Sequence, residues 1–274
     1  MIIMTKTTPW ISFKRYGESG MSKPKESSND GLANIQNNDL DDESQENIQD
    51  IHDKAVQLME TWEQARDPAL LSEAVTMLEQ VVKYTGDNDS TKPYRLRKLA
   101  NALTDRFDRF GGLADLEKGI ALLQQSLVLA GTGHTFRPKL LHNLANALQS
   151  RLWRLGDIAD IEKAIDLEQQ SVELTPEGDD DLPSRMNSLG NAFLSRYLRL
   201  GKVTDLDKAI GAHRQMIALT EHAPKPTWVK NFGNDFYCRF QHLGELNDLE
   251  QAISLYKQAV NLTSGGHIDR PYTP

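Results

Sequence analysis

Side chains that can bind a peptide recur at a fixed spacing through most of this sequence. Asparagine stands at four positions separated by 45, 45 and 43 residues, namely Asn101, Asn146, Asn191 and Asn234. One helical turn earlier stand Arg97, His142, Asn187 and Lys230, and a further turn back stand Tyr94, Lys139, Ser184 and Thr227. An asparagine amide can bond both the N–H and the C=O of a peptide, and lysine or arginine can hold a carboxylate. These columns therefore favour peptide recognition.

The asparagines have a second interpretation, in which they only join helices. An inward-facing amide can bond a neighbouring helix as well as a ligand, because buried polar groups need hydrogen-bond partners. Arginine or lysine followed by asparagine four positions later occurs at Arg97 and Asn101 and again at Lys230 and Asn234, three repeats apart. The sequence leaves both interpretations open, and in either case it predicts a polar, partly basic surface.

These columns belong to a repeat of about 45 residues. Similar stretches cover residues 99–120, 144–165, 189–210 and 232–253. The same steps separate four arginines (Arg106, Arg151, Arg196, Arg239), four glycines (Gly111, Gly156, Gly201, Gly244), four aspartates (Asp115, Asp160, Asp205, Asp248) and four prolines (Pro93, Pro138, Pro183, Pro226). Self-similarity at a fixed period of this length is typical of a solenoid.

Each repeat predicts two helices. Proline is favoured in the first turn of the first helix because its missing N–H would be unpaired there, and glycine ends that helix because it adopts the left-handed conformation easily. The aspartate is predicted to cap the second helix, and the arginine to pair with acids of neighbouring repeats. Apolar spacing adds a degenerate pair before the first clear repeat. The predicted pairs are 48–84, 93–130, 138–174, 183–219 and 226–262, which makes ten helices and no strand.

The composition excludes several classes of protein. The chain has 274 residues and a net charge of −8, which disfavours binding to nucleic acid or to an acidic membrane surface. No apolar run is long enough to cross a membrane, and the single cysteine, Cys238, can form neither a disulfide framework nor a cysteine-based zinc site. We therefore expect a cytoplasmic protein.

Catalytic chemistry has little support in the sequence. The motifs of zinc proteases, phosphate loops, nucleophile elbows and dinucleotide-binding turns are absent. Cys238 could act as a nucleophile only beside a placed histidine, and His242 lies four residues later on the same predicted helix. Because Cys238 occupies a variable position of the repeat, we expect no enzymatic activity, no cofactor and no metal ion.

The two ends of the chain differ from the repeats. Residues 1–43 are predicted to be a disordered leader, because they hold too few apolar side chains to offset the entropy of ordering. The repeat array is predicted for residues 44–263. A further, incomplete repeat is predicted for residues 264–274, since Pro271 lies 45 residues after Pro226. We expect the last helix to present an apolar face that is suited to self-association.

The repeat resembles the tetratricopeptide repeat (TPR). The run from Asn143 to Leu148 is similar to the N-L-G-N-A-Y motif of that family, and Gly190 and Gly233 supply its glycine. The period exceeds the family's usual length of about 34 residues. This long form is similar to repeats common in fungal proteins, where they often precede a caspase-like CHAT domain. The resemblance implies an all-α, right-handed superhelical solenoid of about five antiparallel helix pairs, whose first helices line a concave groove.

Three hypotheses about function follow. In the leading one, the chain is a non-enzymatic scaffold that binds a peptide or protein partner in the concave groove, through the asparagine and basic columns. In the second, it is the regulatory array of a CHAT-type peptidase. In the third, it is an adaptor that associates with itself through the apolar face of its last helix.

Overall fold

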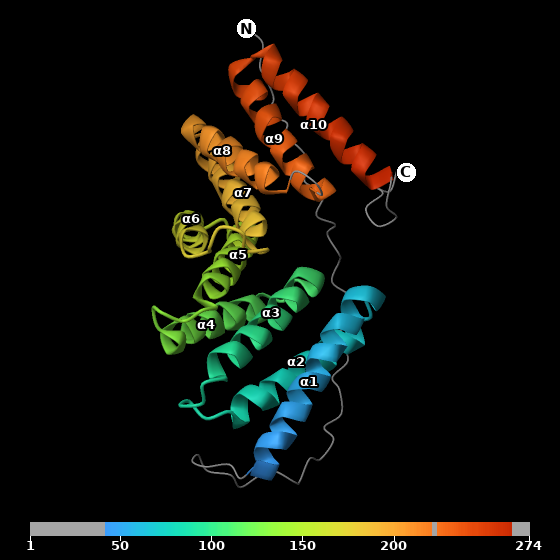
Figure 1. Cartoon of the computed structure of the whole chain (residues 1–274), viewed down its shortest axis with the longest axis vertical. Helices are drawn as coiled ribbons and strands as arrows, with labels where there is room; N and C mark the ends of the chain where they lie inside the picture. Colours follow the sequence, from blue (N-terminus) through green and yellow to red (C-terminus); the bar gives the residue numbers. More distant parts are fainter. Residues whose placement is uncertain (1–41, 221–223, 265–274) are drawn as a thin grey trace. The chain divides into compact units, whose positions relative to one another are not determined.

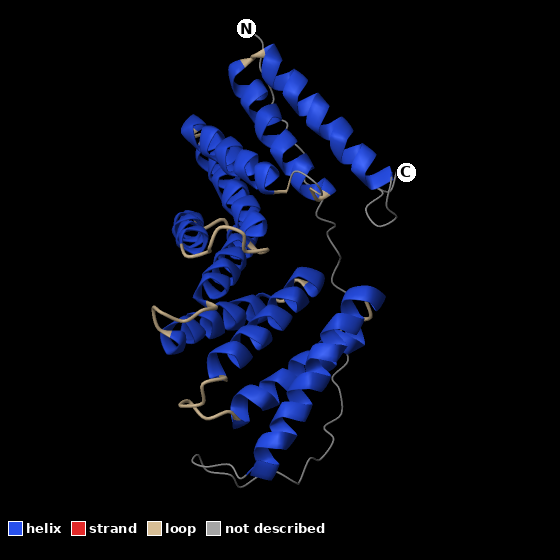
Figure 2. Cartoon of the chain, viewed as in Figure 1, coloured by secondary structure: helices blue, strands red, loops and turns tan. Residues whose placement is uncertain are grey.

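The computed structural model of the protein describes residues 42–220 and 224–264, and every regular element in these ranges is a helix (Figure 2). In chain order (Figure 1), they are α1 (Asp42–Ala65), α2 (Pro68–Tyr84), α3 (Lys92–Phe110), α4 (Leu113–Ala130), α5 (Arg137–Leu155), α6 (Ile158–Glu173), α7 (Leu182–Leu200), α8 (Val203–Leu219), α9 (Pro226–Leu243) and α10 (Leu246–Ser264). The leader predicted for residues 1–43 and the incomplete repeat predicted for residues 264–274 lie almost entirely outside the described residues. Both therefore stay predictions.

The first helix of each clear repeat begins and ends at the residues that the repeat predicts, whereas α1 begins at Asp42, ahead of the predicted start at residue 48. A proline lies in the first turn of α3, α5, α7 and α9. The glycine that ends each of these helices is left-handed, with φ between 69° and 81°: Gly111, Gly156, Gly201 and Gly244. Each glycine N–H donates to the carbonyl four residues earlier, which satisfies a terminal carbonyl of the helix. The predicted ten helices are confirmed across the described residues.

Neighbouring helices pack in chain order. Each helix contacts the one before it and the one after it, and α3, α5, α7 and α9 also contact one another in succession. The largest apolar core runs from Ala100 on α3 to Cys238 on α9. Within two of the pairs, a buried serine of the second helix donates to the proline carbonyl of the first, Ser126 to Pro93 and Ser171 to Pro138. Contacts confined to near neighbours are the mark of a solenoid.

The repeated arginines and aspartates form two-pronged ion pairs. The Nε of Arg151 donates to Oδ2 of Asp160 at 2.8 Å, and its Nη2 donates to Oδ1 at 2.7 Å. Its Nη1 reaches Glu117 of the preceding repeat at 2.9 Å. The same fork recurs at Arg106–Asp115, Arg196–Asp205 and Arg239–Asp248. Three of the four arginines also bond an acid of the preceding repeat, so the predicted pairing between repeats is confirmed.

These forks correct the role predicted for the aspartates, which was wrong. Asp160 lies in the first turn of α6, where its charge suits the helix dipole, but its carboxylate bonds a guanidinium. The cap of α6 is Asp157, whose side chain accepts from the N–H of Ala159. A charge-assisted, two-pronged bond to arginine is stronger than a bond to a backbone N–H, so an aspartate three residues past the cap turns to the arginine.

At two positions of the TPR-like motif, the ring of a neighbouring residue lies so close to the backbone that glycine is required. A Cβ added to Gly190 on α7 would lie 2.6 Å from ring atoms of His213, which is too near for any real contact. A Cβ added to Gly233 on α9 would lie 2.8 Å from the ring of Tyr256. The earlier repeats have alanine at the same position, and there the residue equivalent to the ring is leucine or glutamate. Glycine therefore occurs at this position in the repeats whose facing residue has a ring.

The last helix exposes an apolar residue that the preceding pair buries. Ile210 on α8 is 3% exposed, because it packs against the aromatic side chains of α9. Ile253 holds the equivalent place on α10 and is 43% exposed. This agrees with the expected apolar face on the last helix. None of the helices in the described ranges is long and apolar enough to cross a membrane.

Candidate functional site

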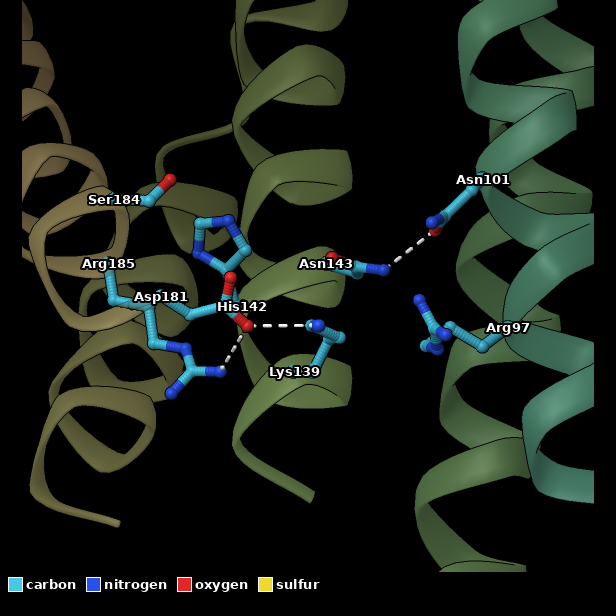
Figure 3. A pocket seen from close by; sticks show the side chains of 8 residues that line it. All are labelled: Arg97, Asn101, Lys139, His142, Asn143, Asp181, Ser184 and Arg185. Atoms are coloured by element: carbon cyan, nitrogen blue, oxygen red, sulfur yellow. Dashed lines mark hydrogen bonds and ion pairs between the residues drawn. The ribbon is translucent and has the colours of Figure 1, made fainter. Parts of the chain in front are cut away.

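A polar cavity of about 250 Å³ lies between the first helices of three successive repeats, α3, α5 and α7 (Figure 3). Its lining residues are Arg97, Asn101, Lys139, His142, Asn143, Asp181, Ser184 and Arg185. Five of these stand in the columns that the sequence singled out for ligand binding, namely Arg97, Asn101, Lys139, His142 and Ser184. The structure thus brings one stretch of the predicted columns together around a single space, which we call the α3–α5–α7 pocket.

Asp181 holds two of the basic side chains in this pocket. Its carboxylate lies 2.9 Å from Nζ of Lys139 and 3.3 Å from Nη2 of Arg185 (Figure 3). The hydrogen bond from Lys139, aided by the charge of Arg185, keeps the pKa of Asp181 below its usual value. Asp181 therefore stays ionised, and it offsets part of the positive charge of the pocket.

Arg97 brings a further positive charge to the pocket, which the charge of Asp181 offsets only in part. Its guanidinium lies 5.2 Å from the ring centroid of Tyr94 and forms no ion pair with a described residue. Its Nε is buried and has no hydrogen-bond partner there. Burial lowers the pKa of Arg97, although the ordinary pKa is so high that the group remains charged. A buried cationic donor without a partner indicates a place for an anionic acceptor.

An amide pair lies on the α3 side of the pocket. Nδ2 of Asn143 donates to Oδ1 of Asn101 at 2.7 Å, which joins α5 to α3 (Figure 3). This bond uses one donor and one acceptor site, so the Nδ2 group of Asn101 and the Oδ1 atom of Asn143 can still bond a ligand. A donor and an acceptor side by side match the C=O and N–H groups of a peptide backbone. The helix-joining interpretation of the asparagine column thus applies to Asn101, and the ligand-binding interpretation stays a prediction.

His142 links the pocket to a buried acid. Its Nδ1 lies 3.1 Å from Oε2 and 3.0 Å from Oε1 of Glu168, whose side chain on α6 is fully buried. Its Nε2 lies 3.1 Å from Nδ2 of Asn146, which itself does not line the pocket. Burial raises the pKa of Glu168, while the neighbouring histidine and Arg185 oppose that effect.

Sequence reasoning missed Glu168, Asn143, Asp181 and Arg185. A signal for Glu168 was present, because it stands 45 residues after the buried Leu123 and 45 before His213. An ionisable residue in a column of core positions indicates a buried polar pair. No comparable signal marked Asp181 and Arg185, because they reach the pocket only through the packing of α7 beside α5.

The remaining predicted residues do not line the α3–α5–α7 pocket: Tyr94, Asn146, Asn187, Asn191, Lys230 and Asn234. Asn187 accepts a hydrogen bond from Asn231 of α9, and Asn234 accepts one from Tyr256 of α10. Both amides therefore join neighbouring helices, as the second interpretation expects. Lys230 is exposed on α9. Asn101 also joins neighbouring helices, but it lines the pocket as well.

Cys238 lies in surroundings that suppress its reactivity. It is buried, and burial raises the pKa of its thiol to about 11. A reactive cysteine needs a lowered pKa, because the thiolate is the nucleophile. His242 lies on the same helix, but its Nδ1 is 3.4 Å from the hydroxyl of Tyr197, and no hydrogen bond joins these two described residues, His242 and Cys238. The geometry gives no support to a cysteine–histidine pair.

Comparison with known proteins bears on the fold. No family model matches the sequence, and no curated protein does. Two solved structures of TPR-like repeats from a Podosopora anserina putative kinesin light chain match with TM-scores of 0.57 and 0.53 at 16% and 18% identity, and cover 80% and 78% of this chain and 95% and 96% of theirs. BtubC (BKLC) from P. vanneervenii matches with a TM-score of 0.53 at 14% identity, over 85% of this chain and 97% of that one. The chain has a TPR-like helical solenoid fold.

Proposed function

We propose that this chain is a non-enzymatic scaffold that binds an acidic segment of a protein partner on the concave face, in the α3–α5–α7 pocket. The observation that carries the proposal is Arg97, a charged group whose buried Nε has no acceptor among the described residues. A carboxylate of the partner would supply that acceptor. The TPR-like fold supports the proposal, because solenoids present extended surfaces built from the same helices in each repeat.

The charge of the pocket favours a carboxylate. Arg97, Lys139 and Arg185 bring three positive charges and Asp181 brings one negative charge, and this surplus stands out in a chain whose net charge is −8. Local positive charge in a hollow concentrates anions there. The free amide groups of Asn101 and Asn143 would bond the backbone next to that carboxylate. An extended acidic peptide satisfies both requirements.

Peptide titrations test this assignment. The probes are a tetraglutamate peptide with a free C-terminus, the same peptide as a C-terminal amide, and tetraalanine with a free C-terminus. Binding of the amide would assign the pocket to side-chain carboxylates, and binding of tetraalanine would assign it to the chain terminus. Arg97→Ala should weaken binding about tenfold or more, because a hydrogen bond to a charged group contributes about 1.5–3 kcal/mol.

A matched control separates the pocket from general charge effects. Lys139→Ala removes a lysine from the pocket, whereas Lys230→Ala removes an exposed lysine of α9 that does not line it. Lys139→Ala should weaken binding, and Lys230→Ala should leave it within about twofold, as expected for a distant and screened charge. Equal effects of the two substitutions, or normal binding by Arg97→Ala, would contradict the proposed site.

A second candidate function is self-association, and the exposure of Ile253 favours it. The equivalent Ile210 is buried by the first helix of the next repeat, so α10 presents a face of the kind that receives such a helix. Light scattering should then show a dimer or larger species at micromolar concentration, and Ile253→Glu should shift it to a monomer. A wild-type monomer at that concentration would exclude this function.

A further inference from the structure

Both ring nitrogens of His142 lie within hydrogen-bond distance of a side chain. The protonation state of this residue therefore affects the charge next to the pocket. In the neutral form, Nδ1–H donates to Glu168 and Nε2 accepts from the Asn146 amide. In the protonated form Nε2 also carries a hydrogen, and the Asn146 amide can rotate to present its oxygen instead. The side chain of His142 is 17% exposed and lines the pocket, so a proton can reach it.

Charged groups face His142 from the helices packed around it. Lys139 comes from its own helix, Arg97 from α3, Glu168 from α6, and Asp181 and Arg185 from the start of α7. The charged residues of α4 are engaged elsewhere, since each bonds another side chain: Asp115 with Arg106, Glu117 with Arg151, and Lys118 with Glu79. Among the described residues, the acids that interact with the ring are Glu168 and Asp181, and Asp181 is already paired with two cations.

The proton count of the His142–Glu168 pair decides its charge. In the neutral form of His142 the imidazole is uncharged and the Glu168 carboxylate is ionised, so the pair carries one negative charge. Uptake of one further proton makes the pair neutral overall, whether the imidazole or the carboxylate holds that proton. The burial of Glu168 favours this uptake, because a negatively charged pair in a dry site is disfavoured relative to a neutral one.

We propose that the His142–Glu168 pair takes up a proton when the α3–α5–α7 pocket binds a carboxylate, so that the pocket binds acidic peptides more tightly as the pH falls. This inference rests on the proposed function of the pocket. Uptake of the proton removes a negative charge from the pair that His142 presents to the cavity beside Lys139, so an anionic ligand binds more tightly. By linkage, a ligand that binds the protonated form more strongly must raise proton binding by the same factor.

The test measures how affinity depends on pH. A tetraglutamate peptide labelled with a rhodamine dye is titrated at constant ionic strength from about pH 7.5 to about pH 5.5, a range in which glutamate side chains stay ionised. The dissociation constant should fall about three- to tenfold over this range, because a change of one charge close to the ligand, with some water between them, has an effect of this size. Calorimetry in two buffers of different ionisation enthalpy should show uptake of a fraction of one proton per peptide at about pH 6.5.

Two variants assign the effect to this pair. His142→Asn with Glu168→Gln removes both titrating groups, and asparagine is the residue that the next repeat has at the equivalent place, Asn187. In this double variant the dissociation constant should no longer vary with pH and proton uptake should vanish. His242→Asn removes an exposed histidine of α9 outside the pocket, and the pH dependence should persist.

The outcomes separate this inference from the function on which it rests. A wild-type affinity that does not change with pH, or a pH dependence that the double variant retains, would overturn the proton linkage while leaving the acidic-ligand site intact. Failure of every acidic peptide to bind at any pH would overturn the ligand assignment itself, and the linkage with it. Circular dichroism of the variants excludes unfolding as the cause of any loss.

Discussion

Two histidine–carboxylate pairs in this protein look alike in composition but differ in surroundings. His142 with Glu168 joins α5 to α6, and His213 with Asp235 joins α8 to α9. Glu168 and His213 hold equivalent places in successive second helices, 45 residues apart. In the first pair the histidine opens on the α3–α5–α7 pocket, whereas in the second both side chains are 0% exposed.

The sealed pair is held by packing on every side. Nδ1 of His213 lies 2.5 Å from Oδ2 of Asp235, while the other ring nitrogen and the other carboxylate oxygen are buried without a hydrogen-bond partner among the described residues. Burial raises the pKa of Asp235, and His213 opposes that effect. The difference between the pairs teaches that access to solvent, rather than residue type, decides whether such a pair can respond to pH or only stabilise a joint.

The largest predicted effect comes from breaking the sealed pair. Asp235→Ala should destabilise the protein by about 3–5 kcal/mol, because removal of one member leaves the other buried without a partner. Denaturant unfolding followed by circular dichroism measures the change. The double variant His213→Leu with Asp235→Ala copies Leu123 and Ala147 of an earlier joint and should recover most of the loss. A double variant as unstable as Asp235→Ala would contradict this account.

A smaller effect is expected from adding one methyl group beside the sealed histidine. Gly190→Ala should destabilise the protein by about 1–3 kcal/mol, because the new Cβ would overlap the ring of His213 and force a shift. Chemical denaturation again gives the value. Combined with His213→Leu, the alanine should be tolerated, because the first clear repeat has alanine and leucine at the two equivalent positions, Ala100 and Leu123. Equal destabilisation in both backgrounds would show that the ring is not the cause.

A half-buried acid outside both pairs, Asp105, provides a reference for pH effects on stability. Burial, reinforced by Asp108 and Glu63, raises the pKa of Asp105 to about 6. The folded protein therefore holds a proton that the unfolded chain has already lost, so stability should fall as the pH rises from about 4 to about 6. Asp105→Asn should gain about 1–2 kcal/mol at neutral pH and nothing at about pH 4. An equal gain at both pH values would exclude titration of Asp105 as the source.

The smallest predicted effect on stability belongs to the open pair. His142→Asn with Glu168→Gln should change the free energy of unfolding by less than about 1 kcal/mol, because neutral amides can replace the hydrogen bond and the site reaches water. The same unfolding measurement on the wild type is the reference. A loss as large as that of Asp235→Ala would show that the two pairs do not differ as described.

Much of the fold could be predicted from local residues. Pro93 and Gly111 delimit α3 as predicted, and the same two residue types delimit every later first helix. The aspartates were interpreted wrongly because an acid that caps a helix and an acid that pairs with an arginine both stand within the first turn of that helix. The sequence position alone does not distinguish the two roles. The choice between them depends on Arg151, which lies on the preceding helix and reaches Asp160 only after the two helices pack.

The candidate site was only partly predictable, for a related reason. Arg97, Asn101, Lys139 and His142 stand in columns that the period reveals and line the pocket, whereas Asn187 and Asn234, in the same columns, bond neighbouring helices without lining it. Column membership sets which helix face a residue occupies. It does not set which partner lies within hydrogen-bond distance, because that depends on the side chains of the adjacent repeat.

The sequence by itself determined the repeat, the helix boundaries and the polar face, because these depend on backbone preferences and apolar spacing within each segment of chain. Tertiary structure alone decided that three repeats enclose the α3–α5–α7 pocket, that Asp181 pairs with Lys139 and Arg185, and that the buried Nε of Arg97 has no acceptor among the described residues. It also decided which histidine–carboxylate pair reaches water. Solvent access and hydrogen-bond distance are properties of packed helices, and no segment of the sequence contains them.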